Sequence, residues 1–223
     1  MTPLKFAAIA LVTLLSVAAG PAQRNWNLAA VTTPEGGILV GNPAAPIKLV
    51  EYVSYTCPHC AHFEVEADAP LRLGLIGPGK GSIEYRSFLR NTVDVAATLM
   101  VQCGPVTKYR GNQTAFLRSQ DKWSREPTPT ERSRWANPDF ATSMRAIASD
   151  LKLYEVMDTR GYTRVQLDRC LANKPLAQKM ADQTKRAYET LNVQGTPSFL
   201  VNGTLQEAHS WEQLNPVLSA LTK

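Results

Sequence analysis

Two cysteines separated by two residues stand directly behind a short apolar run in the segment EYVSYTCPHC, residues 51–60. The run is predicted to be a β-strand over residues 47–53. Pro58 is favoured in the first turn of a helix, and the helical spacing of the apolar side chains behind it predicts a helix over residues 58–75. Cys57 therefore marks a junction between a strand and a helix, and this junction constrains the fold more than any other feature.

A Cys-x-x-Cys pair can hold a metal, staple a loop or exchange electrons with other thiols. A structural zinc site needs four ligands, usually from two such pairs. Four other candidate ligands lie in the chain without forming a second close pair: Cys103, Cys170, His62 and His209. A loop staple fits poorly at the end of a strand. The pattern therefore favours redox chemistry and predicts no metal site.

The N-terminus of a helix stabilises a thiolate through unpaired backbone N–H groups and the helix dipole. Cys57 is therefore expected to be the reactive sulfur, and Cys60, one turn into the apolar face, the shielded one. Pro58 supplies helical φ without needing a hydrogen-bond acceptor. His59 is expected to point a ring N–H or a positive charge at Cys57; the alternative is an ordinary surface histidine.

The first residues have the layout of a secretory signal peptide over residues 1–22: Lys5, an apolar stretch at 6–17, then small residues. The apolar stretch is shorter than the ~20 residues that a spanning helix needs, although an uncleaved anchor is the alternative. The net charge of +5 is mild and scattered, which argues against nucleic-acid binding. Export would place the cysteines in an oxidising compartment, where disulfides persist.

Along the rest of the chain, residues 23–37 are polar and turn-rich and are predicted to form a poorly ordered arm. Pro70 is expected to bend the first helix or end it early. Further segments are predicted as follows: strands at 38–41 and 82–89, helices from Thr92 onward, a proline-punctuated loop at 124–138, a long helix at 175–191, a hairpin around Asn202-Gly203 and a C-terminal helix.

Strands at both ends with helices between them predict one α/β domain, residues 23–223, that carries an all-helical insertion. The two parts of the α/β unit are expected at about 36–92 and 175–223. The insertion is expected at about 93–174.

The sequence resembles the DsbA-type disulfide oxidoreductases of the bacterial periplasm, which belong to the thioredoxin superfamily. CPHC is the active-site tetrapeptide of that family, and EYVSYTCPHCAHFE resembles its whole strand–helix junction. QGTPSFLVNG resembles the segment that carries the family's cis-proline. The likeness covers about residues 36–223 and implies a thioredoxin fold, a mixed β-sheet flanked by helices, with an all-helical insertion.

The resemblance implies roles for three more residues. Pro197 would be the cis-proline, and Thr196 would expose its backbone so that a substrate adds there as an extra strand; an ordinary trans-proline loop is the alternative. Glu51 matches a buried acid that helps to move protons as Cys60 changes state. A solvated carboxylate at the end of the strand is the alternative for Glu51.

Two features depart from the best-known oxidants of the family. Those proteins carry Val before the cis-proline, whereas Thr196 is similar to isomerase-like and less oxidising relatives. The insertion also holds an extra pair, Cys103 and Cys170, which looks like a subgroup with a second, structural disulfide. Two free thiols, or a redox or metal role, are the alternatives for this pair.

The resemblance implies an exported enzyme that gives disulfides to reduced or misoxidised exported proteins without a cofactor. A membrane quinone-linked partner would reoxidise it, and a monomer is the expected state. Two other functions stay open from the sequence. One is a disulfide reductase or isomerase of the same fold, and the other is a peptide-binding chaperone whose cysteines are incidental.

Overall fold

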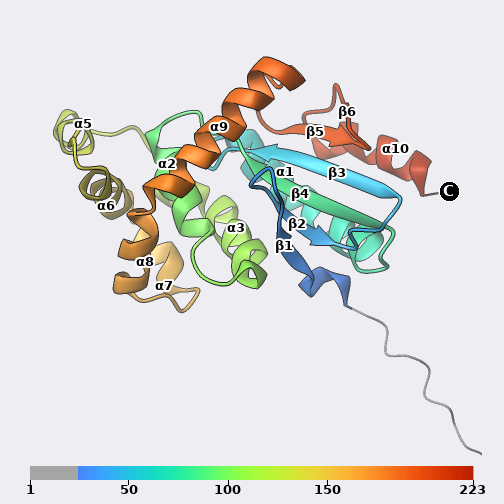
Figure 1. The fold of residues 1–223 in the computed structure, drawn as a ribbon, viewed down its shortest axis with the longest axis horizontal. Coiled ribbons are helices and arrows are strands. Elements are labelled where there is room, and N and C mark those ends of the chain that lie inside the picture. Colours follow the sequence, from blue (N-terminus) through green and yellow to red (C-terminus); the bar gives the residue numbers. More distant parts are fainter. Residues whose placement is uncertain (1–24, 223) are drawn as a thin grey trace, which may run out of the picture.

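The computed structural model describes residues 25–222 (Figure 1). The predicted signal peptide, residues 1–22, lies outside the described residues. The strands are β1 (Ala30–Thr32), β2 (Ile38–Gly41), β3 (Ile47–Val53), β4 (Gly81–Ser87), β5 (Ser198–Val201) and β6 (Thr204–Leu205). The α-helices are α1 (Pro58–Pro70), α2 (Thr92–Val101), α3 (Tyr109–Arg118), α4 (Gln120–Trp123), α5 (Pro129–Trp135), α6 (Phe140–Asp150), α7 (Leu153–Asp158), α8 (Arg164–Leu171), α9 (Lys174–Leu191) and α10 (Trp211–Leu221).

The strands form one mixed sheet in the order β1-β2-β4-β3-β5-β6. β3 and β4 are parallel, and the other neighbours are antiparallel. A parallel pair needs a long crossover, which α1 and the helical turn after it supply. The candidate redox helix α1 therefore forms part of the crossover between β3 and β4. This agrees with the predicted junction between a strand and a helix at Cys57.

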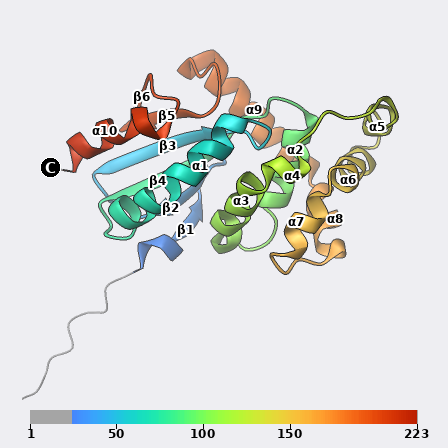
Figure 2. The same ribbon diagram turned by 180° about the vertical axis from the view of Figure 1, so that it is seen from behind.

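β3 separates two apolar layers because its side chains alternate between the faces of the sheet. Leu49 and Val53 join the larger core with Phe63 of α1, whereas Tyr52 joins a smaller core with Ala187 of α9. Figures 1 and 2 show α9 crossing one face of the sheet and α1 lying on the other. α10 packs beside α1, where the rings of Phe63 and Trp211 lie 6.4 Å apart.

The helices α2–α8 form a lobe beyond one end of the sheet, between β4 and α9 in the sequence (Figures 1 and 2). This is the all-helical insertion that the sequence predicted. The lobe shares the larger core with the sheet, since Phe116 and Ile147 are fully buried in it. Within residues 25–222, no helix combines the length and the apolar character that crossing a membrane requires.

Two predictions of local structure were wrong. The described part of the predicted arm, residues 25–37, is ordered: it contains a short 3₁₀ turn, η1 (Trp26–Leu28), and the edge strand β1. β1 forms because β2, further along the chain, supplies its hydrogen-bond partners. The predicted loop at 124–138 contains α5, which begins with a capping box between Thr128 and Glu131 and with a proline in its first turn.

The prediction for Pro70 is confirmed, because α1 ends at this residue. A proline lacks the N–H that an α-helix needs and clashes with the preceding turn. The chain continues as a π-helical turn, η2 (Leu71–Ile76), which lets Leu71, Leu75 and Ile76 stay buried in the core.

The predicted second disulfide is confirmed. Cys103 follows the end of α2, Cys170 lies in α8, and their sulfurs are bonded with the Cα atoms 5.6 Å apart. The bond therefore ties the beginning of the helical insertion to its end.

We expect the Cys103→Ser/Cys170→Ser double variant to lose about 4 kcal/mol of unfolding free energy, because the bridge closes a loop between residues 67 positions apart. Urea denaturation of the oxidised protein and the variant measures this loss. Disulfide exchange by the variant at low temperature should persist, since the bridge lies away from Cys57. Equal stability of the two proteins would show that the bridge does not constrain the unfolded chain.

Candidate redox active site

Cys57 occupies the N-cap position of α1, with extended backbone angles (φ −87°, ψ 118°), and Pro58 begins the helix. Both cysteines of the motif are free thiols and both are buried, Cys57 at 3% exposure and Cys60 at 0%. As a thiol, Cys57 donates to the carbonyl oxygen of Thr196, 3.1 Å from its sulfur. The structure therefore brings Cys57, Cys60 and Thr196 together, although Thr196 lies far away in the sequence.

The surroundings of Cys57 favour its thiolate. A hydrogen bond from the Cys60 thiol is the largest cause that lowers the pKa of Cys57, to about 5. The Thr196 side chain and the backbone amides of Cys60 and His59 add to this, while partial burial opposes it. The sulfur is thus stabilised by the helix terminus that the sequence predicted.

For His59, the expected interaction between its ring and Cys57 stays a prediction. Its imidazole is exposed and makes no hydrogen bond or ion pair with the other residues of the described chain. Its backbone amide, rather than its ring, supports the thiolate of Cys57. The side chain is exposed because position 59 lies on the outer face of the first turn of α1.

Burial gives Cys60 the opposite character. Desolvation is the largest cause that raises the pKa of the Cys60 thiol well above its usual value, followed by its interactions with Cys57. The charge of Glu51 contributes in the same direction. The pair therefore consists of one sulfur that favours the anion and one that favours the thiol.

Glu51 is the buried acid that the sequence suggested. It lies on β3 at 2% exposure, and its pKa is raised to about 8, first by burial and then by repulsion from Glu64, with Arg110 opposing the shift. A carboxyl group with this pKa is protonated at neutral pH and is suited to exchange a proton near it.

One of the charged groups that influence Glu51 belongs to the helical insertion, and the sequence did not predict this contact. Arg110 of α3 forms ion pairs with Glu64 (2.9 Å) and Asp68 (2.7 Å) of α1, and its guanidinium lies 5.1 Å from the ring centre of Tyr85. Thr114 also donates to Glu64. Nothing in the local pattern around Arg110 marks it as buried, since its carboxylate partners are 42 or more residues away.

Two further side chains position the segment before α1. Gln120 of α4 is buried, and its Nε2 atom donates to the carbonyl oxygens of Tyr55 (2.7 Å) and Cys57 (2.9 Å). Asp94 of α2 accepts hydrogen bonds from the Ser54 hydroxyl and the Thr56 amide. The sequence signal for Asp94 was Asn91 three residues earlier, whose side chain caps α2.

The Thr196–Pro197 peptide bond is cis. Pro197 is buried, and its carbonyl oxygen lies 2.8 Å from Nδ1 of His209. His209, considered above as a possible metal ligand, therefore holds the segment that faces Cys57. Among the described residues, no group of three or more His, Cys, Asp or Glu side chains is arranged to hold a metal ion.

Residues 33–220 match the family described as Thioredoxin, and the chain belongs to this family. A protein-disulfide isomerase from Novosphingobium aromaticivorans, known from its crystal structure, is 47% identical, with a TM-score of 0.78 over 83% of this chain and 97% of that one. Wolbachia pipientis α-DsbA1 is 20% identical, with a TM-score of 0.66 over 82% and 89% of the two chains, which shows that the fold is of the DsbA type.

A protein of Rickettsia bellii assigned as a protein-disulfide oxidoreductase is 26% identical over 190 residues. The match covers 85% of this chain and 64% of that protein. The chain spans about three fifths of the length of the curated relatives it matches.

We expect the reduced protein to gain stability, relative to the oxidised protein, as the pH rises from about 5 to about 9. In this window the unfolded Cys57 thiol keeps its proton while the folded sulfur has lost it, so the unfolded state binds more protons. Below about pH 5 the gain is lost. Urea denaturation of both forms across this range, with thiolate absorbance as a second readout, measures the effect. A constant difference between the two forms would contradict a pKa of about 5.

Glu51→Gln is expected to stabilise the oxidised protein above about pH 8 and to leave it little changed below about pH 4.5. The native carboxyl group keeps its proton up to a higher pH than the unfolded one, so its presence costs stability as the pH rises between these values. The amide has no such cost. Thermal unfolding of the oxidised variant at several pH values tests this; Glu66→Gln, an exposed residue of α1, is the control.

Proposed function

We propose that this chain is an exported thiol-disulfide oxidoreductase that introduces disulfide bonds into periplasmic proteins through Cys57 and Cys60. One observation carries the proposal: two neighbouring sulfurs have opposite preferences, with the pKa of Cys57 lowered to about 5 and that of Cys60 raised. Stabilising the Cys57 thiolate favours the reduced enzyme and so makes its disulfide a stronger oxidant. The names of the relatives, an isomerase and an oxidoreductase, support the same chemistry.

The reaction begins with the Cys57–Cys60 disulfide. A substrate thiolate attacks the sulfur of Cys57, forms a mixed disulfide and breaks the bond to Cys60. Cys60 receives the electron pair and, because its pKa is raised, takes up a proton. A second substrate thiolate then attacks the substrate sulfur and expels Cys57 as a thiolate. The substrate loses two electrons, and the enzyme gains them.

Glu51 is the proposed source of the proton for Cys60. Its raised pKa leaves it protonated at neutral pH, and the charge that it carries once ionised raises the pKa of Cys60. After the reaction, the same carboxylate can accept a proton when Cys60 is oxidised again. Burial is the main cause of this raised pKa, and the charges of Glu64 and Arg110 shift it further in opposite directions.

The reduced enzyme needs an electron acceptor before it can act again, and a membrane quinone-linked partner is the proposed one. The signal-like residues 1–22 support export to the periplasm. Thr196 beside Pro197 would bind substrate backbone, and the enzyme would act as a monomer on reduced or misoxidised exported proteins.

A disulfide reductase or isomerase is the second candidate. Thr196, together with the 47% identity to a protein named a protein-disulfide isomerase, favours it. The two candidates differ in how strongly Cys57 and Cys60 hold their disulfide.

We expect a reduction potential near −120 mV, from equilibration with glutathione, and the loss of all exchange in Cys57→Ser. A potential of about −250 mV would make the chain a reductase instead. If Cys57→Ser still suppressed the aggregation of unfolded proteins with wild-type efficiency, the main activity would be that of a chaperone.

A further inference from the structure

A cleft of about 760 Å³ opens beside Thr56, the residue before Cys57. One wall is formed by Arg90 and the first residues of α2, and the other by the loop at 124–127 and by α5. Its volume lies within the range of ligand-binding sites in proteins. The Thr196–Pro197 segment approaches the Cys57 sulfur separately and does not line this cleft. The cleft therefore adjoins the residue before the reactive cysteine, and the proposed mechanism does not use it.

The first wall is fixed directly to the active-site segment. The carboxylate of Asp94 accepts hydrogen bonds from the backbone amides of both Arg90 and Thr56, each at 2.9 Å. Asn91 also donates to the Thr56 hydroxyl at 3.1 Å. Arg90 is thus held by its backbone next to the residue that precedes Cys57, while its side chain is exposed.

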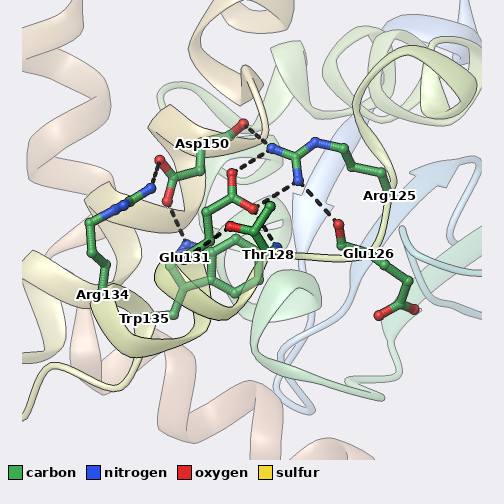
Figure 3. A network of polar contacts seen from close by, with 7 residues as sticks. All are labelled: Arg125, Glu126, Thr128, Glu131, Arg134, Trp135 and Asp150. Atoms are coloured by element: carbon green, nitrogen blue, oxygen red, sulfur yellow. Dashed lines mark hydrogen bonds and ion pairs between the residues drawn. The ribbon is translucent and has the colours of Figure 1, made fainter.

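The second wall is braced by the network in Figure 3. The guanidinium of Arg125 donates twice to the carboxylate of Glu131, at 2.9 and 2.6 Å, and once each to the carbonyl oxygens of Glu126 and Asp150. Arg125 lowers the pKa of Glu131 to about 2, so the pair remains ionised over the whole physiological pH range. The charge of Arg125 is therefore already neutralised within the wall.

Two other arginines of the cleft keep their charge available. The guanidinium of Arg90 makes no hydrogen bond or ion pair with any residue in the described part of the chain. Arg132 lies 3.9 Å from Glu126, but the two side chains are 61% and 93% exposed. An exposed pair of this kind is worth at most about 1 kcal/mol, so a carboxylate of a bound partner can replace Glu126. Trp135, half-buried, adds apolar surface between them.

We propose that this cleft binds the polypeptide segment next to the reacting cysteine of a substrate and favours acidic residues there. The inference rests on the proposed function, since it assigns a substrate preference to the same sulfur. Because Thr56 lines the cleft, a substrate chain bound at Cys57 would extend into it, where its carboxylates would meet Arg90 and Arg132. Attraction between opposite charges speeds encounter and weakens as salt is added.

The test uses the oxidised protein and three peptides of one length, each with a single cysteine flanked on both sides by Glu, Gln or Lys. The rate of mixed-disulfide formation with Cys57 is measured for the wild type and for Arg90→Glu/Arg132→Glu. Comparing the two proteins with the same peptide cancels differences in the reactivity of the peptide thiols. At low salt, we expect the acidic peptide to react roughly three to ten times more slowly with the double variant, and the basic peptide to react faster.

Two controls make the result specific. Arg72→Glu/Lys80→Glu, the same change of charge at two exposed residues in η2 and the turn after it, should keep the wild-type rates for all three peptides. Arg90→Gln/Arg132→Gln, a milder change, serves if charge reversal disturbs folding, and it should remove the preference without inverting it.

Equal ratios of variant to wild-type rate for the three peptides, in both double variants, would overturn the proposal. Equal losses for Arg72→Glu/Lys80→Glu and Arg90→Glu/Arg132→Glu would also overturn it, because the effect would then be one of net charge alone. Dithiothreitol, which has no flanking residues, reports basal exchange. Failure of the wild type to oxidise dithiothreitol would instead overturn the proposed function.

Discussion

The position of the Cys57 sulfur at the start of α1 is the constraint on which the rest of the site depends. The sulfur is a good leaving group because unpaired amides and the Cys60 thiol stabilise its negative charge. That geometry requires the backbone at 54–57 to turn sharply from strand to helix without a side-chain cap of its own. Two side chains from other helices hold this turn: Gln120 donates to the carbonyl oxygens of Tyr55 and Cys57, and Asp94 accepts from the amide of Thr56.

Beneath this turn the molecule keeps several ionisable groups out of water. Glu51 and Glu64 are both buried, and leaving two such carboxylates unpaired would be costly. Arg110 compensates the charge of Glu64 by an ion pair. Glu51 has no such partner among the described residues and stays neutral because its pKa is raised. The arrangement keeps a carboxyl group with a raised pKa in the interior at the expense of some stability, as functional sites often do.

The features that could be predicted from the sequence are those that depend on neighbouring residues. The strand before Cys57, the helix after it, the helix end at Pro70 and the turn at Asn202-Gly203 all follow from local patterns, and the CPHC tetrapeptide indicated the chemistry. β1 was missed because a strand of three residues is too short to show an alternating pattern. The helix α5 was missed although its Thr-Pro-x-Glu start is a recognisable capping signal, because the prolines around it also indicate a loop.

The buried partners of the site could not be predicted in this way. Gln120 and Arg110 look like ordinary polar residues of surface helices, and only the packing of the insertion against α1 reveals their contacts. Both come from the helical lobe, which shares no motif with the tetrapeptide. Two homologous chains with the same four active-site residues can therefore diverge in oxidising strength through changes in the lobe alone, so the tetrapeptide by itself is a poor guide to the direction in which such an enzyme moves electrons.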